Sequence, residues 1–184
     1  GIPVSEHTTE DDCNRLLQMI ESTEANKLVF LGDFLHARQG KTGPVRTLLF
    51  QWREMCADVE ILLIRGNHDI NSGDPWPELS IKCLPEPFKM EKWACRHHPL
   101  ENHNFPYLAG HIHPGYRVQG IGRGGIRDAC FWVRKDSIVL PAFGSFTGLK
   151  NIMPSPLEDI YLTNNEDIVK VVTQKNLRKN RHQS

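Results

Sequence analysis

The chain has 184 residues, with 22 Lys and Arg residues against 22 Asp and Glu residues, so that its formal net charge is zero. This length is enough for one domain with a hydrophobic core, and the balanced charge excludes binding of polyanions through overall charge, so that any such contact must be local. The longest apolar runs are far shorter than the roughly 20 residues that span a bilayer, and no signal-peptide pattern opens the chain. We therefore expect a cytoplasmic protein. Its five cysteines, an odd number without a Cys-x-x-Cys pair, favour free thiols.

Two amphipathic helices are predicted in the first third of the chain, at residues 8–23 and 44–57. Each places apolar residues on one helical face, the first with Cys13, Leu16, Leu17 and Ile20, the second with Val45, Leu48, Leu49, Trp52 and Cys56. Short apolar runs follow at 27–31 and 59–64, without the polar alternation of a half-exposed strand, and such runs are typical of buried parallel strands. The alternation of helices and strands predicts an α/β domain whose functional residues lie at the carboxyl ends of its strands.

The pattern changes after residue 70, where proline-rich loops separate short strand-like runs. We expect strands near 92–96, 106–109, 130–134, 137–143, 159–163 and 167–173, in a second, more irregular or antiparallel sheet. The organisation predicted is one domain over 1–174, followed by a basic, flexible tail over 175–184.

Polar residues follow both of the predicted parallel strands directly. Gly32-Asp33 ends the first strand and leaves a carboxylate at the edge of the sheet, where it can bridge two cations. Gly66-Asn67-His68-Asp69 ends the second strand and brings an amide, an imidazole and a carboxylate together. The glycines let the backbone approach closely.

Histidines supply the remaining candidate ligands, at His97 and in the segment His111-Ile112-His113. The single residue between the last two histidines predicts that both rings lie on one side of an extended segment. Oxygen donors mixed with imidazole, and no thiolate, favour Mn, Fe, Ni or Zn over Mg or Ca. Two such cations about 3.5 to 4 Å apart can hold a phosphate and lower the pKa of a bound water to roughly 7. The pattern indicates a hydrolase of phosphate esters.

The order of these motifs resembles that of the calcineurin-like metallophosphoesterases. His97-His98-Pro99 is one of these family motifs. Four other segments resemble more narrowly the ligase-associated DNA damage response endonuclease branch: Gly32-Asp33-Phe34-Leu35-His36, Arg65-Gly66-Asn67-His68-Asp69, Gly110-His111-Ile112-His113-Pro114 and Leu140-Pro141-Ala142-Phe143-Gly144-Ser145-Phe146-Thr147-Gly148. The resemblance implies a sandwich of two mixed β-sheets flanked by helices. It also implies a DNA nuclease with two divalent metal ions, manganese first among them, and a DNA ligase and a helicase of a repair system as partners.

The same resemblance implies a role for individual residues. Asp33 would bridge the two metals, Asn67, His97 and His111 would hold one metal, and His113 would hold the other. His68 would be the catalytic acid, oriented by Asp69. His36 would be a metal ligand or lie just behind the ligands, and Arg65 and His98 would be candidates for substrate binding.

One motif of the family does not occur in this sequence. The family places an Asp-x-His at the end of an earlier strand, which would lie before Gly1. Two alternatives to a nuclease therefore stay open: a phosphoesterase acting on nucleotides or other small phosphate esters, and a non-catalytic metal-binding or interaction module.

Some further residues allow two interpretations. Arg117, Arg123 and Arg127 surround a glycine-rich segment that we read as a hairpin loop, and they either contact a phosphate backbone or are simply solvated. Trp76, between two prolines, either packs in a loop or stacks on a base. Trp52 continues the apolar stripe of its helix and is predicted to lie in the core.

Overall fold

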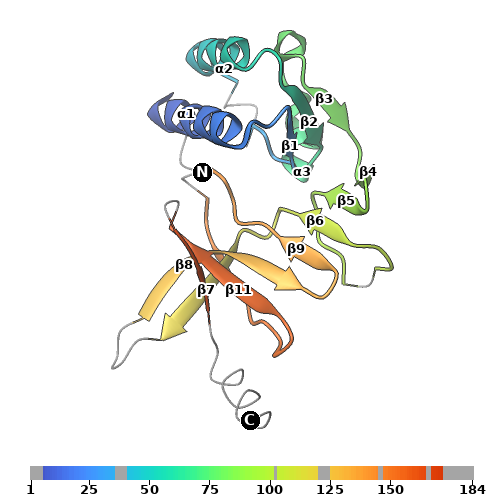
Figure 1. Ribbon diagram of the computed structural model, residues 1–184. Helices are drawn as coiled ribbons and strands as arrows, with labels where there is room; N and C mark the ends of the chain where they lie inside the picture. Colours follow the sequence, from blue (N-terminus) through green and yellow to red (C-terminus); the bar gives the residue numbers. More distant parts are fainter. Residues whose placement is uncertain are drawn as a thin grey trace.

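The computed structural model of the protein describes residues 6–35, 41–101, 103–119, 125–144, 147–164 and 167–171. Figure 1 shows its two parts, a small sheet with two long helices on one side of it and a large sheet beyond. Within the described residues no helix is both long enough and apolar enough to cross a membrane.

The first part alternates helix and strand as predicted. Its helices are α1 (Glu6–Thr23), α2 (Gly43–Met55) and the short α3 (Asn67–Ser72), and its strands are β1 (Lys27–Phe30), β2 (Glu60–Ile64) and β3 (Lys82–Leu84). The strands pair in the order β1-β2-β3, and both pairings are parallel. Thr42 caps α2, because its hydroxyl accepts a hydrogen bond from the backbone N–H of Val45 at 3.4 Å.

The core of this part lies between the two long helices and the sheet. The buried apolar residues of both helices form one cluster with β2, made up of Cys13, Leu16, Val45, Leu49, Trp52, Cys56, Val59, Ile61 and Leu79. The predicted stripes are thus confirmed except for Leu48, which is not part of this cluster, and Trp52 is only 2% exposed, as expected for a core residue. Trp76 packs against the same cluster, with its ring edge-on to Phe50 at 6.5 Å between centroids. The packing interpretation of Trp76 is therefore the one that the structure supports.

The second part is a mixed sheet of nine strands. Its central path runs β10-β7-β8-β9-β6-β5-β4, and β11 pairs with β8 and β12. The strands are β4 (Phe88–Met90), β5 (Trp93–Arg96), β6 (Tyr107–Ala109), β7 (Pro114–Gln119), β8 (Gly125–Arg134), β9 (Ser137–Val139), β10 (Lys150–Asn151), β11 (Asp159–Thr163) and β12 (Ile168–Lys170). The pairings β5–β6, β6–β9 and β7–β10 are parallel, and the others are antiparallel.

The two sheets turn the ends of four strands toward one place. β2 is buried on both faces, with Ile61 to Ile64 no more than 2% exposed, so the small sheet is covered on the side opposite the helices as well. The carboxyl ends of β1, β2, β5 and β6 lead directly into the four predicted motifs. The α/β architecture with two sheets and flanking helices is as predicted.

Candidate metal centre

The turn after β1 is shaped around the imidazole of His97. Gly32 has a φ of +94°, and a Cβ at this position would lie 2.0 Å from Nδ1 of His97. Only glycine fits such a close approach and such a conformation. The following residue, Asp33, also has a positive φ, of 55°, which is uncommon for a residue with a side chain. The turn therefore presents the Asp33 carboxylate from a strained backbone.

The turn after β2 lies against the first one. A Cβ on Gly66 would be 2.3 Å from the Asp33 carboxylate, so this position too has no room for a side chain. The Asp33 carboxylate accepts a hydrogen bond from the backbone N–H of His68 at 3.0 Å, in the first turn of α3. Asp33 and the Gly66-Asn67-His68-Asp69 motif are thus brought together as the sequence indicated.

Asp69 joins these two turns. Its side chain is 2% exposed, and its carboxylate accepts hydrogen bonds from the backbone N–H groups of Asp33 (2.6 Å), Phe34 (3.0 Å) and Gly66 (2.9 Å). A carboxylate buried with three N–H donors is well satisfied and holds its donors in place. The structure therefore shows Asp69 fixing the loops around Asp33.

His97 follows β5 and points into the same space. The ring is 1% exposed, and its Nδ1 lies 2.7 Å from the carbonyl oxygen of Leu31. Because a carbonyl only accepts, Nδ1 must carry the proton, and Nε2 of the neutral ring then carries a lone pair.

Three further atoms that can bind a metal surround this lone pair. Asn67 Oδ1 lies 3.0 Å from Nε2 of His97, Asp33 Oδ2 lies 3.5 Å from it, and Nδ1 of His111 lies 3.0 Å from it. The two oxygens are acceptors, so they repel the lone pair unless a cation lies among them. An amide oxygen, a carboxylate and two imidazoles are the donor set of a transition-metal site, so the residues fit the metal that the motifs predicted.

His111 reaches the cluster from the end of β6 through a tight turn. Ile112 N–H donates to the carbonyl of Gly110 at 2.7 Å, and His111 between them has a φ of +65°. His113 also has a positive φ, of 51°. The expectation that both rings lie along an extended segment is therefore wrong. The reason is the hydrogen bond between Gly110 and Ile112, which folds the backbone into a strained turn of the γ type.

The environment of His111 favours its neutral form. Burial lowers its pKa, and so do the neighbouring imidazoles of His97, His98 and His113, whereas Asp33 acts in the opposite direction. A neutral imidazole is the form that binds a metal. His113 follows His111 by two residues and immediately precedes β7.

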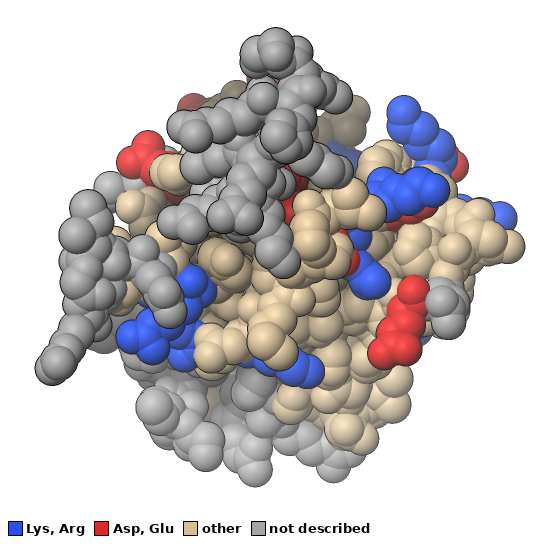
Figure 2. All heavy atoms as spheres, turned by 90° about the horizontal axis from the view of Figure 1, so that it is seen from below, with Lys and Arg blue, Asp and Glu red and all other residues tan. Residues whose placement is uncertain are grey.

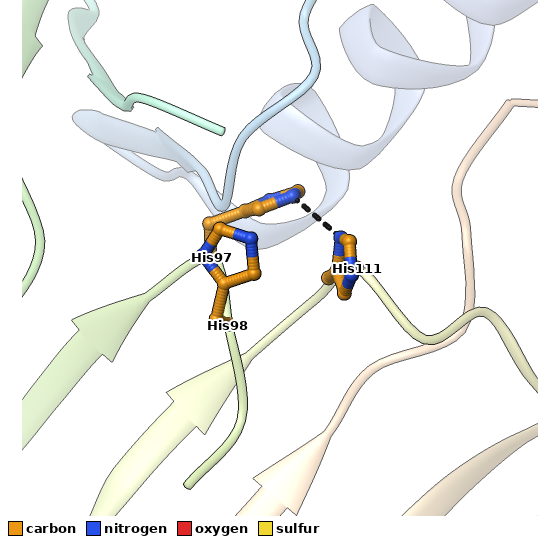
Figure 3. A group of neighbouring side chains, drawn as sticks. All are labelled: His97, His98 and His111. Carbon is orange, nitrogen blue, oxygen red and sulfur yellow. Dashed lines mark hydrogen bonds between the residues drawn. The ribbon is translucent and has the colours of Figure 1, made fainter. Parts of the chain in front are cut away.

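His98 is the third imidazole of a group visible in Figure 3, with His97 and His111. Ligand atoms of the three rings lie within 4.8 Å of one another. His97 and His98 come from the end of β5 and His111 from the end of β6. His98 was predicted only as a candidate for substrate binding, and the structure brings it to the edge of the metal centre.

Glu86 is the residue that sequence reasoning missed. Its Oε2 accepts the backbone N–H groups of His97 (2.9 Å) and His98 (3.0 Å), and its Oε1 lies 2.7 Å from Nδ1 of the His98 ring. Burial raises the pKa of Glu86, but the hydrogen bonds from His98 and His97 and the charge of Arg96 outweigh it, and the pKa is lowered. No motif marked this residue, because it stands between two prolines in a segment that reads as a loop.

The remaining candidate residues have different settings. Arg65 binds Asp74 through two N–H groups, at 2.6 and 2.7 Å, so most of its guanidinium faces that carboxylate. His68 sits in the first turn of α3. His36 lies outside the described residues.

Comparison with known proteins agrees with this geometry. The family model of the calcineurin-like phosphoesterases matches residues 7–152. The chain therefore belongs to this family, and it is a hydrolytic metallophosphoesterase.

One solved structure gives a more particular likeness. The nuclease MPE of Pseudomonas putida is 36% identical to this chain, with a TM-score of 0.83, and the match covers 93% of this chain and 82% of that one. A search of the curated proteins gave no match.

Proposed function

We propose that the protein is a metal-dependent phosphodiesterase that hydrolyses DNA. The observation that carries the proposal is the convergence of Asp33, Asn67 and His111 on the lone pair of His97, at distances of 3.0 to 3.5 Å. The substrate class is supported by the likeness to a nuclease at 36% identity.

Two divalent transition-metal ions, with manganese as the first candidate, fit this donor set. Asp33, Asn67, His97 and His111 would hold one of them, and Asp33 and His113, with His36 as a further candidate, would contribute to the other. Two such ions would supply an activated water and charge neutralisation at the phosphate. The chain's own contribution is to hold the ligands, through the Leu31 carbonyl and the carboxylates of Asp69 and Glu86.

His68 is the residue that we propose as the general acid for the leaving alkoxide. An imidazole is suited to proton transfer near neutral pH. Its backbone N–H is bound to Asp33, which fixes the residue beside the proposed metals. Asp69 would position His68, because its hydrogen bonds hold the start of α3 against the turn after β1.

The substrate class is tested by parallel kinetics with the purified full-length protein. We expect Mn²⁺-dependent hydrolysis of bis-p-nitrophenyl phosphate and of single-stranded DNA, and a much lower kcat/KM for cyclic nucleotides and phosphate monoesters. Faster turnover of the small esters than of DNA would favour the small-molecule alternative. No hydrolysis of any of them, with metal bound, would favour the non-catalytic module.

The acid role is tested by His68→Asn. This variant keeps the backbone N–H that binds Asp33 and removes the titrating ring. We expect kcat to fall roughly 10²- to 10⁴-fold, the usual contribution of general acid catalysis, with metal content unchanged. An unchanged kcat would remove His68 from this role.

The setting of the reaction is proposed from the resemblance alone. It comprises a cytoplasmic role in DNA repair and association with a DNA ligase and a helicase. Co-purification of the tagged protein with a ligase or a helicase, in a DNase-treated extract, would support it.

A further inference from the structure

A groove lies along the free edge of β7. It has a volume of about 530 Å³ and is lined by Tyr116 and Arg117 of β7 and by residues 151–156. Strand β10 pairs with β7 only as far as Asn151, opposite Gly115, and after the bond from Ile152 N–H to the Gly115 carbonyl the chain leaves the strand. Within the part of the chain that the structure describes, no strand therefore pairs with this edge of β7 beyond Gly115.

Two arginines lie opposite each other at this place. Arg117 of β7 and Arg127 of β8 are cross-strand partners, so their side chains share one face of the sheet. Arg127 donates to the carbonyl oxygen of Leu149. Among the residues that the structure describes, the guanidinium of Arg117 meets no carboxylate at ion-pair distance. Like charges opposite each other are unfavourable unless an anion lies between or above them.

The nearby carboxylates do not offset this charge. Asp128 is next to Arg127 in the strand, and the alternation of side chains turns it to the other face. Glu158 accepts the backbone N–H of Ser155, which lines the groove, and its carboxylate is paired with Arg134 at 3.4 Å. Figure 2 shows one group of Lys and Arg side chains at the left of the face seen from below and further groups near its centre and at its upper right.

Strand β7, which lines one side of the groove, begins three residues after His111 of the metal centre. His113 immediately precedes β7, and its carbonyl accepts the backbone N–H of Lys150 at 2.9 Å, at the start of β10. Arg117 is four residues farther along an extended strand, which at roughly 3.3 Å per residue is about 13 Å. A polymeric substrate with one phosphate at the metal centre can therefore reach Arg117 with another.

We propose that this groove binds the phosphate backbone of a nucleic-acid strand that extends from the metal centre. Arg117 contacts a phosphate, and Asn151, on the same face, donates from its amide. A positively charged groove that follows the backbone is a common part of sites that bind single strands. The proposal rests on the proposed function and extends it, because it assigns binding of a long substrate to residues outside the metal centre.

The test is a comparison of a long and a short substrate in Arg117→Ala, with Arg117→Lys as the charge-retaining variant. For a single-stranded DNA of 20 nucleotides we expect KM to rise roughly three- to tenfold in Arg117→Ala and to be largely restored in Arg117→Lys. The salt dependence of binding should lose about 0.7 of a unit of log–log slope. For bis-p-nitrophenyl phosphate, kcat and KM should not change, because this ester is too short to reach the groove.

Lys135→Ala is the matched control, since it removes one charge from a side chain 93% exposed at the opposite end of β8. It should leave KM for DNA unchanged. Equal losses on both substrates, or an unchanged KM for DNA in Arg117→Ala, would overturn the proposal. If the wild type hydrolyses neither substrate, the proposed function fails by itself. Fluorescence anisotropy of a labelled oligonucleotide then still compares wild type with Arg117→Ala, and equal affinities would reject the groove.

Discussion

At the scale of single residues, the site depends on which nitrogen of each imidazole is protonated. The Leu31 carbonyl fixes the proton of His97 on Nδ1 and so aims a lone pair at Asn67 and His111. Glu86 orients His98 in a similar way, because one of its oxygens is hydrogen-bonded to the His98 ring. The other oxygen accepts the backbone N–H groups of His97 and His98. Groups that lie behind metal ligands in this manner orient them and tune their affinity.

Glu86→Gln tests this orientation. A glutamine has one carbonyl oxygen, so it can accept from the backbone or from the His98 ring but not from both, and its NH₂ group would face a donor. We expect the Mn²⁺ affinity to fall roughly 10- to 100-fold, measured by calorimetry on the chelator-treated protein. Glu78→Gln is the control, since it breaks a surface ion pair with Arg46 at 3.0 Å. An affinity in Glu86→Gln equal to that of the control would contradict the role of Glu86.

At the scale of elements, the helices and strands with a clear apolar pattern could be predicted from the sequence. Helices α1 and α2 and strands β1 and β2 have such patterns, and all four were expected within a few residues of their observed bounds. Helix α3 was not expected, because its six residues, Asn67–Ser72, are mostly polar. The helix is held by a contact with a segment distant in the sequence, because the Asp69 carboxylate accepts hydrogen bonds from the backbone of the turn after β1.

Strand β7 was missed for a similar reason. It begins with Pro114-Gly115, which reads as a turn, although proline is accepted as the first residue of a strand. Gly115 is needed because a Cβ there would lie 2.8 Å from the Leu149 side chain. The candidate ligands, in contrast, could be named from the motifs, since each follows the end of a strand, whereas the turn at His111 and the contacts of Glu86 depend on tertiary packing.

The loop after α3 gives a prediction of pH dependence. The hydrogen bond from Arg65 lowers the pKa of Asp74, against a smaller opposing effect of burial, from an ordinary value of 3.8. A lowered pKa in the folded state means that the ion pair stabilises the fold above about pH 3.8 and ceases to do so as the pH falls through the lowered value. Both side chains are partly exposed, at 32% and 46%, so solvent screening limits the effect to at most about 1 kcal/mol.

The measurement is urea unfolding of the wild type and Asp74→Asn at pH 7 and pH 2.5. We expect the variant to be less stable at pH 7 and the difference to shrink at pH 2.5, because this pH lies below the ordinary pKa of 3.8 and Asp74 of the unfolded chain is then largely protonated. A difference of the same size at both values would show that the ion pair is not its cause.

At the scale of the whole molecule, the metal centre is where the two sheets meet. The small parallel sheet supplies Asp33 and Asn67 from the ends of β1 and β2, and the large sheet supplies His97 and His111 from the ends of β5 and β6. Gly110 brings the two parts into contact, since a Cβ on it would lie 3.0 Å from the Leu31 carbonyl. Neither sheet alone holds all of the proposed ligands, so we expect metal binding to stabilise the arrangement of the two parts.

The assignment of the metal centre is tested most directly by a Mn²⁺ titration of hydrolysis by the chelator-treated protein, carried out on the wild type and on His97→Ala. We expect no hydrolysis of bis-p-nitrophenyl phosphate without metal and recovery on addition of Mn²⁺. In His97→Ala, recovery should require at least roughly tenfold more Mn²⁺ or fail altogether. Hydrolysis that survives chelation, or a titration that His97→Ala leaves unchanged, would contradict the assignment of this cluster as the metal centre.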